Sequence, residues 1–165
     1  DKLYALISTA AGVFRYVPPT TPEGSWDVTC LLVQPTSDIV ATDFDGDGKL
    51  EILTFSKFHG DTLAIWHEGQ TRDRYEQVWC DPQKRSFLHA LWAADLNGEK
   101  CAVIGNRKDG RDLLLVRYVD GEYTVDVIDH DLGPANCMVY KHDGSNYIVA
   151  AYRETDQLAL YKVVE

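Results

Sequence analysis

The strongest constraint on the fold is a strand–turn–strand unit that occurs four times along the chain. The copies begin at residues 2, 49, 100 and 145, which are 47, 51 and 45 residues apart. They read KLYALISTA and GVFRYVPP, KLEILTFSKF and DTLAIWHEG, KCAVIGNRK and RDLLLVRYVDG, and SNYIVAAYRE and DQLALYKVVE. Self-similarity at an interval of this size is typical of folds that are built from repeated supersecondary units.

Further strand-like segments extend these copies on either side. Segments at 38–43, 88–95 and 136–142 precede the last three copies, and segments at 26–33, 75–79 and 123–128 follow the first three. If the strands of one unit are called a to d, the chain reads bcd, abcd, abcd, abc, and helical periodicity is absent. Four short antiparallel strands recurring every ~40–50 residues predict the blades of a β-propeller. A β-sandwich also has many short strands, but it gives no reason for the same unit to recur.

The ragged ends of this pattern decide which kind of propeller we expect. The first unit lacks its innermost strand and the last unit lacks its outermost strand, so the usual closure by pairing the chain ends within one blade is not available. We predict an all-β arc of about four blades, with approximate bounds 1–34, 35–84, 85–132 and 133–165. Further blades, from sequence outside this segment or from another chain, are expected to complete a larger ring. A self-contained four-bladed ring is the alternative.

An acidic loop between strands a and b of the second unit is the strongest local motif. Its sequence, DFDGDGKLE, places carboxylates at every second residue and adds a fourth at the end. Four like charges this close repel one another unless a cation lies among them, and calcium suits them because it takes several oxygen ligands in an irregular cage. We predict one structural Ca²⁺, held by the side chains of Asp43, Asp45, Asp47 and Glu51 and by the main-chain carbonyl of Lys49. A solvated Asp/Gly turn is the alternative.

The acidic loop differs from the loop of an EF-hand. An EF-hand needs a bidentate Glu at its twelfth position, and that position is occupied here by Thr54. The residues after the loop, 52–55, are β-branched or aromatic in most positions and indicate a strand where an EF-hand has a helix.

The acidic loop and the repeat together resemble the FG-GAP/VCBS class of β-propeller repeats, which occurs in integrin α-subunits, fungal lectins and several polysaccharide-active enzymes. The matching motif is DFDGDGKLEIL at 43–53, with weaker echoes at 95–99 and 142–145, whereas the FG and GAP tripeptides are absent. The resemblance implies a calcium hairpin between strands a and b. In the later copies the position of Glu51 is taken by Ala102 and Tyr147, so we expect one cation site, in the second blade.

The resemblance implies that a ligand binds on the face opposite the acidic loop, because the loops that usually carry function in this class lie there. The a–b loops all fall on one face of the disc, and the d–a and b–c loops fall on the other. Where the d–a loops enter strand a, we expect Asp38, His89 and Asn136 to approach the central channel, with Trp92 beside His89. A His can bind a metal or act as a general base, and an aromatic ring can stack on a sugar. Alternatively, Trp92 packs between blades and His89 bonds to a neighbouring backbone group.

Composition limits the classes of binding partner and the cellular locations that we expect for the protein. Sixteen basic against twenty-six acidic residues give a net charge of −10, so nucleic acid and anionic membrane are poor partners. No apolar run approaches the ~20 residues of a transmembrane helix, so we expect no membrane insertion. The cysteines, Cys30, Cys80, Cys101 and Cys137, are too widely spaced for a zinc site, and buried free thiols are expected, with a disulfide pair as the alternative. An extracellular or cell-surface location is expected, and a cytoplasmic one is the alternative because of the free thiols.

Two classes of function fit these observations. The chain contains no Walker loop, G-x-G-x-x-G, H-E-x-x-H or Ser/His/Asp order. This favours a non-catalytic, calcium-stabilised module that presents one face to a carbohydrate or protein ligand. The alternative comes from the resemblance, which also implies the propeller part of a carbohydrate-active enzyme of the lyase or dehydratase type, with substrate in the central channel. Convergence of His89 and Asn136 on an ion or a deep polar pocket would favour the enzyme.

Overall fold

The computed structural model describes residues 3–164, and every regular element in this range is a β-strand. The all-β prediction is therefore confirmed. The fourteen strands are β1 Ala5–Thr9, β2 Gly12–Val17, β3 Asp27–Leu32, β4 Thr36–Thr42, β5 Glu51–Ser56, β6 Leu63–Glu68, β7 Tyr75–Cys80, β8 Leu88–Leu96, β9 Glu99–Asn106, β10 Leu113–Val119, β11 Glu122–Asp129, β12 Pro134–His142, β13 Ser145–Tyr152 and β14 Gln157–Lys162.

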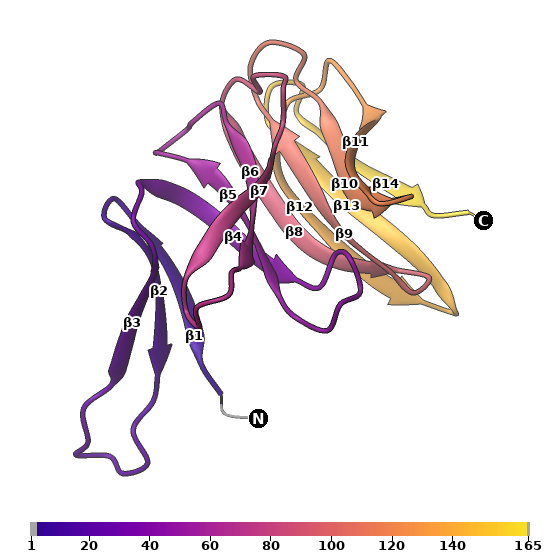
Figure 1. Ribbon diagram of the computed structural model, residues 1–165. Helices are drawn as coiled ribbons and strands as arrows, with labels where there is room; N and C mark the ends of the chain where they lie inside the picture. The colour runs from indigo at the N-terminus through magenta and orange to yellow at the C-terminus, as the bar shows by residue number, and fades with distance from the viewer. Residues whose placement is uncertain (1–2, 165) are drawn as a thin grey trace.

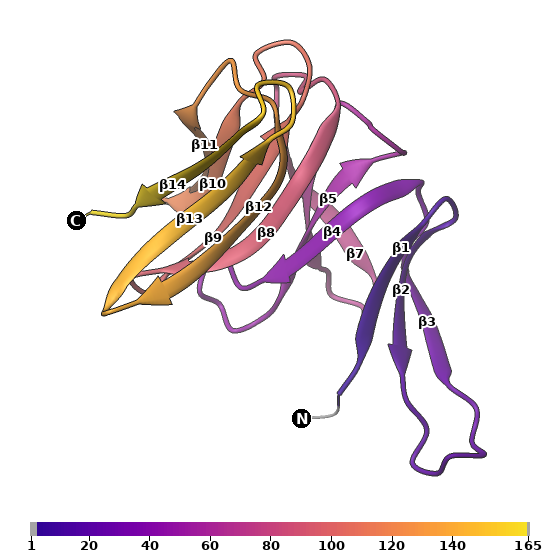
Figure 2. The same cartoon turned by 180° about the vertical axis from the view of Figure 1, so that it is seen from behind.

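The strands form four antiparallel sheets in chain order. The first sheet is β1-β2-β3, the second β4-β5-β6-β7, the third β8-β9-β10-β11 and the fourth β12-β13-β14. This is the predicted pattern of three, four, four and three strands. Figures 1 and 2 show the sheets following one another as an arc, with the two ends of the chain at opposite ends of it.

Apolar side chains pack between neighbouring sheets, and the side chains of a central strand contact the sheets on both sides of it. Along β9, Ala102 and Ile104 belong to the cluster shared with the second sheet, whereas Val103 belongs to the cluster shared with the fourth. Along β5, Leu53 and Phe55 likewise face the third sheet. Because successive side chains of a strand point to opposite faces, an unbroken apolar run is what a strand buried on both faces requires.

The innermost strand of each of the last three sheets begins with the same irregularity. The register of β4, β8 and β12 shifts between Thr36 and Asp38, between Leu88 and Ala90, and between Pro134 and Asn136. One extra residue on strand a is therefore left unpaired in each sheet, as in a β-bulge. In β8 this residue is His89, and its imidazole is exposed.

The loops gather on two opposite faces, as the strand directions predict. On one face, backbone bonds join the d–a connections to the b–c turns, from Leu88 N to the Gly60 oxygen at 3.1 Å and from Arg107 N to the Phe87 oxygen at 3.0 Å. This face lies at the top of Figure 1, and the hairpins β4–β5, β8–β9 and β12–β13 point the other way. We call the two faces the turn face and the hairpin face.

The outward faces of the two end sheets remain apolar. Met138 and Leu160 both pair with Val149, so the three side chains share one face of the fourth sheet, and the first two are 44% and 58% exposed. On the first sheet, Ile7 and Val28 are also exposed. Such faces are what a blade presents to the next blade of an arc.

All four cysteines are free thiols. Cys101 and Cys137 are buried between sheets, Cys30 is half-buried and Cys80 is exposed. Burial raises the pKa of the Cys101 and Cys137 thiols to about 12. These two thiols are therefore protonated at neutral pH and serve as small apolar core residues.

A buried ion cluster fastens the connection between the second and third sheets. Arg85, in the β7–β8 connection, donates from Nε to Asp81 Oδ2 at 2.8 Å, and its Nη1 lies 3.7 Å from Asp112 Oδ2. All three residues are buried. Burial raises the pKa of Asp112, although the Arg85 charge opposes this shift. The guanidinium is thus the counter-charge of two carboxylates that have little access to water.

We expect Arg85→Ala to lower the free energy of unfolding by about 3–5 kcal/mol, because it leaves buried carboxylates without a counter-charge. The matched control is Arg72→Ala, whose side chain is 87% exposed and whose loss should change stability by less than about 0.5 kcal/mol. Urea unfolding of both variants measures the difference, and equal stability would contradict a role for the Arg85 cluster.

Candidate functional site

Four side chains on the hairpin face form a cluster that could hold a metal ion. Asp45, Asp47, Glu51 and His67 each place a ligand atom within 4.8 Å of the others. Three come from the β4–β5 hairpin and the fourth from β6. The structure therefore brings together three of the predicted carboxylates and adds an imidazole.

The loop holds its shape through its own Asp side chains. Asp43 accepts hydrogen bonds from the backbone nitrogens of Gly46, at 2.8 Å, and Gly48, at 3.0 Å. Both glycines have positive φ angles, 77° and 87°, which glycine adopts without steric cost. Asp47 accepts from Lys49 N at 2.8 Å. Asp43 and Lys49, also predicted as ligands, thus lie in the loop but outside the cluster of four.

Glu51 is the buried member of the cluster. It is 0% exposed, and its Oε2 accepts a 2.6 Å hydrogen bond from Phe44 N. Within residues 3–164 its other oxygen, Oε1, has no hydrogen-bond partner. Burial, opposed by the Phe44 N–H and reinforced by Asp45, raises the pKa of Glu51 to about 7. A buried oxygen without a donor is costly, and a cation bound beside it would remove that cost.

His67 is oriented with one ring nitrogen toward the carboxylates. Its Nδ1 lies 2.7 Å from the Glu68 carbonyl oxygen and donates to it, so Nε2 faces Asp47 Oδ2 at 3.1 Å and Glu51 Oε1 at 3.7 Å. Burial lowers the pKa of His67, but its bonds to Glu68 and Asp47 outweigh burial and raise it. A backbone acceptor on one nitrogen is also the usual orientation of a metal-bound imidazole.

Sequence reasoning missed His67 because it lies outside the loop. The signal that could have found it is strand register. Ile52 pairs with Trp66, so the next positions on the two antiparallel strands, Glu51 and His67, face each other.

Of the predicted rim residues, Asp38 and His89 line one pocket of the turn face, whereas Asn136 and Trp92 do not line it. Asp38 and Asn136 each accept a 2.9 Å hydrogen bond from the next backbone nitrogen of their own strand. Burial raises the pKa of Asp38, although His89 opposes the shift. His89 Nδ1 lies 2.8 Å from the Ala135 carbonyl oxygen and so ties the third sheet to the fourth.

Trp92 is also separate from His89. It lines a pocket between the third and fourth sheets together with Tyr140 and Lys141, whereas His89 lines another pocket with Asp38 and His59. Trp92 is 41% exposed. The structure therefore places it between two blades, and the expected pairing of Trp92 with His89 in one site is not observed.

A stack of rings on the turn face was not foreseen from the sequence. His59, from the β5–β6 turn, stacks on Phe87, from the β7–β8 connection, with centroids 3.9 Å apart and planes 12° apart. The His89 ring continues the stack at 5.4 Å from His59. Lys108 Nζ lies 5.2 Å from the Phe87 centroid. We call Phe58, His59, Phe87, His89 and Lys108 the rim cluster.

Two residues of the rim cluster have strained backbones. His59 and Phe87 have φ angles of 51° and 61°, a region that bulky residues rarely adopt. Such conformations cost about 1–3 kcal/mol each and persist where the surroundings enforce them, often at functional sites. The neighbouring backbone bonds to Gly60 and Arg107 are the surroundings that hold these two rings in the stack.

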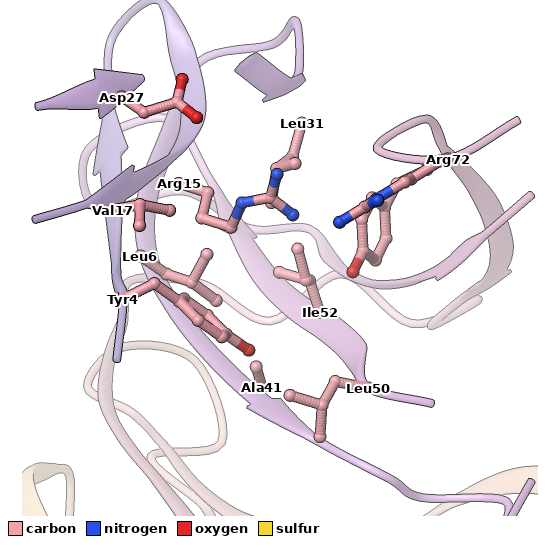
Figure 3. A pocket seen from close by; sticks show the side chains of 11 residues that line it. Tyr4, Leu6, Arg15, Val17, Asp27, Leu31, Ala41, Leu50, Ile52 and Arg72 are labelled. Carbon is pink, nitrogen blue, oxygen red and sulfur yellow. The ribbon is translucent and has the colours of Figure 1, made fainter. Parts of the chain in front are cut away.

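A further pocket lies between the first and second sheets. Figure 3 shows apolar side chains such as Leu6 and Ile52 on its walls, and the guanidinium groups of Arg15 and Arg72 pointing into it from opposite sides. Arg15 is already engaged with both carboxylate oxygens of Asp73. This pair links the first sheet to the loop before β7, which is a structural role.

Comparison with known proteins adds no family. No family model matches the chain, and no curated protein matches it at a significant level. Residues 3–164 contain no helix that is long and apolar enough to span a membrane.

The turn that carries His59 depends on Gly60. A Cβ at this position would lie 2.1 Å from Ser56 Oγ and 2.6 Å from the Lys57 carbonyl oxygen. We expect Gly60→Ala to displace the turn and to destabilise the protein by about 1–3 kcal/mol. In the control, Gly69→Ala, the nearest atom is the movable end of the Glu76 side chain, so the loss should be smaller. Urea unfolding compares the two, and an equal or larger loss for Gly69→Ala would contradict the expectation.

Proposed function

We propose that the chain is a non-catalytic binding module, in which a calcium ion fixes the β4–β5 hairpin and the turn face binds a carbohydrate or protein ligand. The observation that carries this proposal is the Glu51 carboxylate, which is 0% exposed and has one unpartnered oxygen beside two further carboxylates. The resemblance of 43–53 to the calcium hairpins of FG-GAP/VCBS repeats supports the same ion.

The ligand types favour calcium over softer metals. Asp45, Asp47 and Glu51 supply only oxygen atoms, which hard cations prefer. The loop oxygens of Asp43 and Lys49 lie next to these ligands in the sequence and would complete the coordination. In this proposal His67 stays neutral and accepts a hydrogen bond from a water on the ion, with its Nδ1 held by Glu68.

The separation of the two faces supports a structural ion. The cluster lies at the hairpin end of β5, whereas the rim cluster lies at the turn end, beyond Ser56. A calcium ion in the hairpin would therefore not touch a ligand bound at the rim. It would order the strand that carries both sites.

The exposed apolar outer faces support the proposal that further blades cover them. Leu158, on the outer sheet face of β14, is 76% exposed, and Val28 on β3 is 47% exposed. We propose that the chain functions as an arc within a larger ring.

A carbohydrate-active enzyme is the second candidate, and one observation favours it. Asp38, His59 and His89 line one pocket of the turn face, and these are residue types that general acid–base chemistry uses. Incubation with polysaccharides containing uronic acids tests this candidate, since a lyase would generate an unsaturated product with ultraviolet absorbance.

Calcium should raise the melting temperature of the protein, because an ion that binds only the native state stabilises it by mass action. At a concentration roughly 100-fold above Kd the gain is about 2.7 kcal/mol, or about 5–10 °C for a chain of this length. Differential scanning calorimetry with calcium and with chelator measures it. No shift between the two conditions would contradict the proposed ion.

Two variants locate the ion. Asp45→Ala should lose the calcium response, whereas Asp120→Asn, at an exposed turn with a φ of 52°, should keep it. His67→Ala should also keep most of the response, because imidazole is not a preferred calcium ligand. Loss of the response in Asp120→Asn but not in Asp45→Ala would place the ion elsewhere.

The effect of Glu51→Gln on the free energy of unfolding should change sign when calcium is added. Without the ion the variant should be at least as stable as its parent, because the amide oxygen can still accept the Phe44 N–H while the buried charge is gone. With calcium the parent should become the more stable of the two. Chemical denaturation under both conditions tests this, and a variant that is less stable in chelator would show that the carboxylate needs no ion.

A further inference from the structure

The rim cluster combines exposed apolar surface with basic groups. Phe58 is 80% exposed, and its ring lies 3.8 Å from that of His59 at a tilt of 58°. Phe58, His59 and His89 line one pocket together with Asp38. An exposed aromatic ring above a small polar pocket is suited to the apolar face of a sugar, with the polar side chains available to its hydroxyl groups.

Basic groups concentrate at this rim, although the chain as a whole is acidic, with a net charge of −10. Arg107 and Lys108 lie over the Phe87 ring, at 5.0 Å and 5.2 Å from its centroid. Burial and the positive charges of His89, Arg107 and Lys108 lower the pKa of His59. Arg107 and Lys108 are thus the cations of this rim, whereas the lowered pKa leaves His59 neutral at pH 7.

One of these cations has no counter-charge nearby. Arg107 is paired with Glu154, from the β13–β14 turn. Within residues 3–164, Lys108 lies within ion-pair distance of no carboxylate, and it is exposed. Because an exposed, unpaired ammonium attracts anions, the acid group of a ligand bound at the ring stack would find its partner here.

We propose that the rim cluster binds an acidic saccharide. The sugar ring lies against Phe58, Asp38 and His89 receive its hydroxyl groups, and its carboxylate or sulfate lies toward Lys108. This inference rests on the proposed binding function, because it names the ligand class of the turn face. The backbone hydrogen bonds at Gly60 and Phe87 hold the rings of His59 and Phe87 in place before the ligand arrives, which lowers the entropic cost of binding.

Isothermal titration of the full chain in calcium tests the proposal. The probes are trigalacturonic acid, its fully methyl-esterified form, which lacks the charges, and a sulfated disaccharide, which separates sulfate from carboxylate recognition. At least one acidic probe should bind, and the methyl ester should bind about tenfold more weakly than the acid or not at all if the carboxylate is recognised. Phe58→Ala and Lys108→Ala should each weaken binding about tenfold, whereas Lys162→Ala, an exposed lysine on β14, should not.

Each other outcome overturns the assignment. Binding of acid and ester with equal affinity, without binding of the sulfated probe, would show that charge is not recognised. Acid binding that survives both rim variants would place the site elsewhere. Absence of binding by all three probes would also overturn the acidic saccharide as the ligand. If the melting temperature of the protein still rises with calcium in that case, the proposed function stands with a different ligand. Loss of the calcium response would instead refute the proposed function itself.

Discussion

The hairpin face depends on one buried carboxylate. Glu51 holds the amide of Phe44 through Oε2, and Phe44 packs into the apolar cluster between the second and third sheets. The Phe44 ring also meets Tyr123 of β11 edge-on, with centroids 6.2 Å apart. A charge placed at the edge of the core therefore connects the acidic loop to the packing of two sheets. Its compensation by a cation would stabilise the loop and the sheet interface together.

The turn face is organised by backbone hydrogen bonds and by the bulges. The β7–β8 and β11–β12 connections bond to b–c turns, so residues distant in the sequence are brought side by side on the turn face. His89 is the extra residue in β8, and its Nδ1 contacts the Ala135 carbonyl oxygen of the fourth sheet. Rigid sheets thus position exposed loop residues, which is a common arrangement for binding surfaces.

The fold could be predicted from the sequence because the strand–turn–strand pattern is repeated. Four copies of one unit fix strand number, order and direction, and each copy supports the others. The acidic loop was readable because Asp43, Asp45, Asp47 and Glu51 lie within nine residues. Local patterns such as these depend little on tertiary contacts.

Contacts between segments that are distant in the sequence could not be predicted from it. His67 faces Glu51 only because of the β5–β6 register, and Phe87 joins His59 only because the β7–β8 connection crosses the preceding turn. Trp92 and His89 are close in the sequence, yet they line different pockets. Position along a strand predicts its face, but the partner across an interface is set by how the sheets pack.

A crystal structure in calcium, with anomalous scattering data collected at long wavelength, tests the central claim most directly. We expect one anomalous peak in the β4–β5 hairpin, with oxygen atoms of Asp45, Asp47 and Glu51 at about 2.3–2.6 Å from it, and none at the turn face. A water molecule or a direct ion pair between His67 and Glu51 in place of that peak would contradict the calcium hairpin.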